Sequence, residues 1–100
     1  MIRIGEVIFP PEVEEKLWTR HELTIWDVLQ VVHDPEGEPP RWDEDPKHGG
    51  RVIVRGRTRG TRSRLVYVAL RPIDWDGGVW ACITAFVPDD EEYGADEEGW

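Results

Sequence analysis

The stretch from Arg51 to Arg71 constrains the fold of this 100-residue chain more than any other. Two apolar runs, Val52–Val54 and Leu65–Leu70, flank a centre rich in turn-forming residues between Gly56 and Ser63. Apolar runs separated by Gly and small polar residues are typical of a β-hairpin. The second run is apolar on both faces, so it predicts a strand in the middle of a sheet.

Charge is strongly segregated along the chain, whose net charge is −9. Residues 51–71 hold seven of the twelve Lys and Arg residues and no acid, whereas residues 88–100 hold seven acids and no Lys or Arg. On the predicted first strand of the hairpin, Arg51, Arg55 and Arg57 share one face with Ile53, because side chains alternate along a strand. This basic face is expected to meet an anion, which is RNA, another protein or the chain's own acidic segments.

Two helices are predicted before the hairpin. Pro11 suits the first turn of a helix over Glu12–Arg20, whose early acids and late bases match the helix dipole. A second helix begins at Thr24, which can cap it together with Asp27 in a variant of the capping box. This helix is expected to end near Asp34-Pro35 and to form a compact corner with the first.

The strands then decide the fold class. A third strand, Val79–Val87, follows a turn at Asp74–Gly78, and Arg3–Phe9 is either a short strand or an extended lead-in. Residues 34–50 are expected to be a loop, because they contain four Pro, three Gly and six acids. The sequence thus predicts an α+β fold in which two N-terminal helices pack on a three- to four-stranded antiparallel sheet. Residues 1–88 form its single domain, and residues 89–100 are an acidic, flexible tail.

Composition argues against several kinds of site. Cys82 is the single cysteine and lies in an apolar run, so a buried thiol is expected. The three His residues do not have metal-ligand spacing, so neither a zinc site nor a cofactor is expected. A small-molecule ligand is not expected either. No secretory signal or membrane-spanning run is visible, which favours a cytoplasmic protein.

Four short motifs follow one another within residues 8–92. The first is Arg20-His21, a basic–His pair that ends the first helix, and the second is the capped helix Thr24–Pro35, which ends in Asp-Pro. The third is Gly56-Arg57-Thr58, a Gly-x-Thr strand end before a basic turn. The fourth is the last strand, Ile83-Thr84-Ala85-Phe86, followed by an acid, Glu91 or Glu92. In this order the chain resembles the BrnT-type toxins of bacterial type II toxin–antitoxin systems, which are compact relatives of the RelE/ParE-like ribonuclease fold.

The chain also departs from the pattern of that family. The family has Arg in the last strand where this chain has Phe86. It has Asn where this chain has Leu17, Gly where this chain has Glu22, and Trp-Asp where this chain has Phe9-Pro10. The change at Phe86 bears on catalysis, because a cation at that position would help to hold the scissile phosphate.

The resemblance implies a metal-independent endoribonuclease that is neutralised by a cognate antitoxin protein. Such cleavage needs a base for the 2′-OH proton, cations for the phosphate and an acid for the leaving oxygen. His21 is the expected acid–base residue, because imidazole titrates near neutral pH. Arg20, Arg55 and Arg57 are expected to surround the phosphate. The other arginines expected to bind RNA are Arg51, Arg59, Arg62 and Arg64.

Each of these residues also has a purely structural interpretation. His21 suits the end of a helix, where the dipole stabilises a cation, and the arginines suit a solvated face whose charge is offset by acids. The acidic tail is a hypothetical occupant of the same basic face. The alternative function is therefore a non-catalytic RNA- or protein-binding module that retains the toxin fold. Base stacking would need aromatic residues from outside the segment between Arg51 and Leu65, because this segment has none. For a protein partner, the candidates for an exposed contact are Trp26 and Trp42.

Overall fold

A computed structural model describes residues 2–35, 39–46, 49–58 and 63–87. Its elements are β1 (Glu6–Ile8), α1 (Pro11–His21), α2 (Ile25–His33), β2 (Arg41–Asp45), β3 (Gly49–Arg57), β4 (Leu65–Asp74) and β5 (Val79–Phe86). The strands form one sheet in the order β1-β5-β4-β3-β2. The α+β class is confirmed. The expected sheet of three to four antiparallel strands is wrong, because the sheet has five strands and β1 runs parallel to β5.

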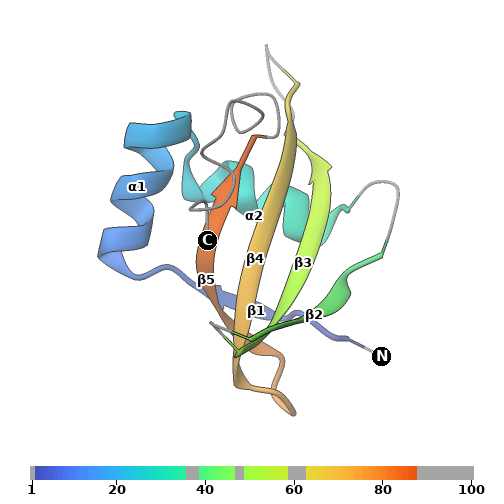
Figure 1. The fold of residues 1–100 in the computed structure, drawn as a ribbon. Coiled ribbons are helices and arrows are strands. Elements are labelled where there is room, and N and C mark those ends of the chain that lie inside the picture. The colour runs from blue at the N-terminus through green and yellow to red at the C-terminus, as the bar shows by residue number, and fades with distance from the viewer. Residues whose placement is uncertain (1, 36–38, 47–48, 59–62, 88–100) are drawn as a thin grey trace.

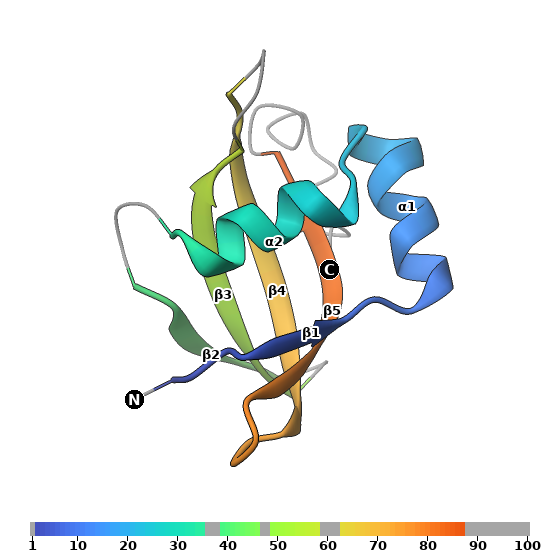
Figure 2. The ribbon, with the colours of Figure 1, turned by 180° about the vertical axis from the view of Figure 1, so that it is seen from behind.

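The two helices cover the sheet unequally. In Figure 2, α2 crosses one face of the sheet, where it packs against β3 and β4. In Figure 1, α1 stands at the side of the sheet next to β5, and neither helix lies over the face turned towards the viewer. We call this second side the helix-free face. Its side chains are those that β3, β4 and β5 direct away from α2, because successive side chains of a strand point to opposite faces.

The core lies between α2 and the sheet. Val52 and Val54 of β3 are fully buried on the side of α2, and their partners on β4 are Leu70 and Val68. Burial of each such side chain stabilises the fold by about 1.5–3 kcal/mol. Gly56 continues the same side of β3. A Cβ atom there would lie 3.2 Å from Cγ1 of Val31, so glycine allows α2 to approach the strand closely.

Local signals define both helices as predicted. Pro11 occupies the first turn of α1, and the helix ends at Glu22, which adopts the left-handed conformation with φ of 55°. The Thr24 hydroxyl accepts a hydrogen bond from the Asp27 backbone N–H at 3.2 Å, and the Asp27 carboxylate accepts one from the Thr24 N–H at 2.9 Å. This capping box starts α2 directly after the corner. Neither of the two described helices is long and apolar enough to span a membrane.

The expected loop over residues 34–50 is wrong in part, because it contains β2. This strand pairs antiparallel with β3 at the edge of the sheet and carries charged residues, as edge strands commonly do, so it lacks a clear apolar alternation. Two contacts fix its register. The Trp42 ring occupies the space that a side chain on Gly50 would need, and Asp43 pairs with Arg51. The acidic tail lies outside the described residues.

The Cys82 thiol is buried in the core, as predicted, and its sulfur donates to the Thr84 carbonyl at 3.7 Å. Burial raises the pKa of this thiol to about 12, because the thiolate would lose its hydration. We therefore expect a thiol reagent at pH 8 to label the native protein at least about 100-fold more slowly than the protein unfolded in guanidinium chloride. Equal labelling rates in the two states would contradict the buried position.

Candidate nucleic-acid interface

Strand alternation divides the predicted arginines between the two sides of the sheet. Val52, Val54 and Gly56 face α2, so Arg51, Arg55 and Arg57 of β3 lie on the helix-free face, as predicted. Arg57 pairs with Leu65 and is exposed near the hairpin end. Arg59 and Arg62 lie outside the described residues.

Arg55 begins a row of three side chains that crosses the helix-free face. In the sheet register, Arg55 is opposite Tyr67, and Tyr67 is opposite Phe86. The guanidinium carbon of Arg55 lies 5.9 Å from the centroid of the Tyr67 ring, within the range of a cation–π contact. The Tyr67 and Phe86 rings are stacked with their centroids 5.5 Å apart and their planes 9° from parallel. We call these residues the Arg55–Tyr67–Phe86 row.

The guanidinium of Arg55 packs against the Tyr67 ring and not against a hydrogen-bond acceptor of the described part of the chain. Its Nε atom is buried and has no hydrogen-bond partner there. A buried donor without an acceptor costs the folded protein about 1–3 kcal/mol, and the contact of this guanidinium with the Tyr67 ring offsets part of that cost. The guanidinium geometry favours bidentate binding of a phosphate or a carboxylate.

Arg51 has a different environment on the same face. Its Nε atom donates to Oδ2 of Asp43 at 3.0 Å, and its side chain is 10% exposed. The pair joins β2 to β3 and offsets the charge of Arg51. Arg51 therefore contributes to the structure of the sheet edge, and Arg55 is the better-placed cation for a ligand on the helix-free face.

Arg64 lies on the side of the helices and caps α1. Its Nη1 atom donates to the carbonyl of His21 at 2.8 Å, and its Nη2 atom donates to the carbonyl of Glu22 at 3.0 Å. Both carbonyls belong to the end of a helix, where they lack partners within the helix and carry partial negative charge. The two bonds bring the end of α1, with the half-buried His21 and the exposed Arg20, to the turn end of the β3–β4 hairpin.

Tyr67 and Phe86 are not among the residues predicted to bind RNA. They lie on different strands and come together only through the pairing of β4 with β5. A period-two reading of Leu65–Leu70 places Tyr67 on the side opposite Val66 and Val68, which was the available signal. Within the described ranges, no group of three or more His, Cys, Asp or Glu side chains is placed to hold a metal ion.

Replacement of Arg64 by alanine removes both bonds to the end of α1. We expect Arg64→Ala to lower the free energy of unfolding by about 2 kcal/mol, since each lost bond is charge-assisted and partly exposed. Urea denaturation measures the change. Arg71→Ala is the matched control, because Arg71 is exposed and makes no hydrogen bond or ion pair with a described residue. An equal loss in both variants would contradict the capping role.

The geometry thus defines one basic and aromatic candidate interface on the helix-free face and one His-containing corner at the turn end of the hairpin. Comparison of the chain with protein-family models, with curated proteins and with solved structures gives no match. The function therefore has to be inferred from these two places in the molecule.

Proposed function

We propose that this protein binds single-stranded RNA on the helix-free face of its sheet, and that it is a divergent member of the BrnT-like toxin group with a RelE-like fold. The observation that carries the proposal is the Arg55–Tyr67–Phe86 row. It combines a cation that lacks an acceptor in the described chain with two stacked aromatic rings. Single-stranded nucleic acids are recognised by this combination of cations for phosphates and rings for bases.

The row also gives a role to Phe86, which differs from the Arg of the resembling family. Phe86 extends the aromatic surface beside Tyr67, and stacking of a base on such a ring contributes about 1–3 kcal/mol. Phosphates would lie against Arg55 and Arg57. The net charge of −9 disfavours nonspecific attraction of nucleic acid at long range, so binding depends on this local face.

Arg55→Gln should weaken the binding of a labelled single-stranded RNA by about tenfold at low salt, because one phosphate contact is lost. The slope of log affinity against log salt should also fall by about 0.7. Tyr67→Ala should weaken binding to a similar extent through lost stacking. Fluorescence anisotropy measures both effects, with thermal unfolding as a check that each variant is folded.

Lys16→Ala is the matched charge control, because Lys16 is exposed on α1, away from the helix-free face. It should leave RNA affinity unchanged. Failure of the unmodified protein to bind RNA at low salt, or an equal loss in the Lys16 and Arg55 variants, would exclude this function. Tighter binding of duplex than of single strands would also count against the stacking role of the row.

The second candidate function is metal-independent cleavage of the bound RNA, as in a toxin neutralised by a cognate antitoxin. It is favoured by the two hydrogen bonds from Arg64 that hold the His21 corner at the turn end of the basic hairpin. His21 would act as the acid–base residue, and Arg20 beside it would stabilise charge on the phosphate, whereas Arg55 and Arg57 lie on the opposite side of the sheet. The aromatic side chain of Phe86 favours binding over cleavage.

If cleavage occurs, it should proceed in the presence of EDTA, and His21→Ala should lower its rate by about 10²–10⁴-fold. His33→Ala is the matched control, because His33 is exposed at the end of α2 and should be dispensable. The assay is gel analysis of RNA fragments, together with growth of bacteria that express each variant. Absence of both cleavage and toxicity, with RNA affinity intact, would exclude the enzyme and leave the binding function.

A further inference from the structure

Two tryptophans on the helices are far more exposed than their size would predict. Trp18 of α1 is 57% exposed and Trp26 of α2 is 70% exposed. Large aromatic side chains contribute much free energy when they leave water, and exposed ones mark contacts with partners. Exposure of Trp26 agrees with its prediction as a candidate for an exposed protein contact.

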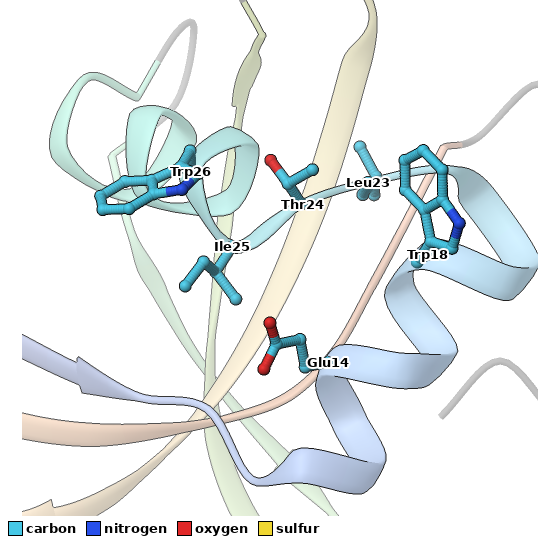
Figure 3. Close-up of a pocket in the computed structure, with 6 residues that line it drawn as sticks. All are labelled: Glu14, Trp18, Leu23, Thr24, Ile25 and Trp26. Atoms are coloured by element: carbon cyan, nitrogen blue, oxygen red, sulfur yellow. The ribbon is translucent and has the colours of Figure 1, made fainter.

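These tryptophans flank one pocket of about 320 Å³ at the α1–α2 corner. Its lining consists of Glu14, Trp18, Leu23, Thr24, Ile25 and Trp26. Figure 3 shows the two indoles at opposite ends of the pocket, with Glu14 pointing from α1 towards Thr24 and Ile25. Leu23, between the two helices, is fully buried in the core and fixes the position of the corner. We call this the Trp18–Trp26 pocket.

The polar groups of the pocket are few, and only part of them is engaged. The Thr24 hydroxyl is occupied in the capping box with Asp27. In contrast, neither the Glu14 carboxylate nor the indole N–H of Trp18 or Trp26 makes a hydrogen bond with a described residue. A pocket between two exposed indoles, with one available carboxylate, suits an apolar chain segment that carries a cation.

The surroundings of Trp18 reinforce this charge preference. Residues three and four positions away share a helix face, and for Trp18 these include Glu14 and Glu15, which are both exposed. This acidic rim disfavours RNA. It also disfavours a symmetric contact with a second copy of the chain, because such an interface would place the rim against itself.

We propose that the Trp18–Trp26 pocket docks a basic amphipathic segment of a partner protein. Apolar side chains of the segment insert between the two indoles, and a Lys or Arg beside them pairs with Glu14. This follows the mode in which a short amphipathic segment lays its apolar face into a groove. The docking surface lies on the helices and the RNA-binding row on the helix-free face, so the inference does not depend on the proposed RNA binding.

The test uses two labelled synthetic peptides that share Leu at positions i, i+3, i+4 and i+7. One carries Lys at the flanking positions and the other carries Glu. The full-length protein should bind the Lys peptide, more weakly as salt rises, and should bind the Glu peptide at least about tenfold less tightly. Anisotropy measures the affinities.

Variants then locate the site. The double variant Trp18→Ala/Trp26→Ala should lose at least about tenfold in affinity for the Lys peptide, as is typical of interface tryptophans. Glu14→Gln should reduce both the affinity and its salt dependence, and it provides a second variant if the double variant does not fold. Ile73→Ala is the control, because Ile73 is 49% exposed on β4 and should not change peptide affinity.

Four results would overturn the proposal. They are no binding of the Lys peptide, equal binding of the two peptides, unchanged affinity in the double variant and Glu14→Gln, or displacement of the peptide by RNA. A fifth is a dimer in sedimentation experiments that dissociates in the double variant, because the occupant would then be a second copy of the chain. Arg55→Gln should leave peptide binding intact, which separates this test from that of RNA binding.

Discussion

The alternation of side chains along β3 is the constraint on which the rest of the molecule depends. Val52, Val54 and Gly56 have to face α2, because their side of the strand forms the core and Val31 packs directly over the glycine. The arginines between them are thereby fixed on the other side. A slip of register by one residue would bury three guanidinium groups and expose the valines, so the same pattern specifies both the core and the basic face.

The elements that were predicted correctly have their determinants close together in the sequence. The helix that follows Thr24 is specified by a cap and its partner three residues on, and the hairpins are specified by apolar runs around short turns. The strand β2 has no such determinants, and for β1 the sequence left a short strand and an extended lead-in open. Each is an edge strand with a polar or mixed pattern, and each is a strand because a distant neighbour offers its backbone groups. Edge pairing of this kind is not encoded in local periodicity.

The candidate site divides in the same way. Charge identifies the basic segment and strand alternation puts Arg55 and Arg57 on one face of it, whereas the contacts of Arg64 depend on the hairpin register and on the position of the α1 terminus. Tyr67 and Phe86 form one surface only after β4 and β5 pair. The cations of the candidate interface can therefore be predicted from composition, whereas its aromatic residues come together only in the tertiary structure.

The parallel pairing of β1 with β5 has a consequence for how this chain reaches its native state. Glu6 pairs with Val79, so a strand near the start of the chain pairs with the last strand of the sheet. Contacts of such high sequence separation raise the contact order and slow folding, because a long loop must close before they form. During synthesis, β1 cannot pair until β5 has left the ribosome. Assembly of the hairpin on α2 should precede closure of the sheet by its N-terminal strand.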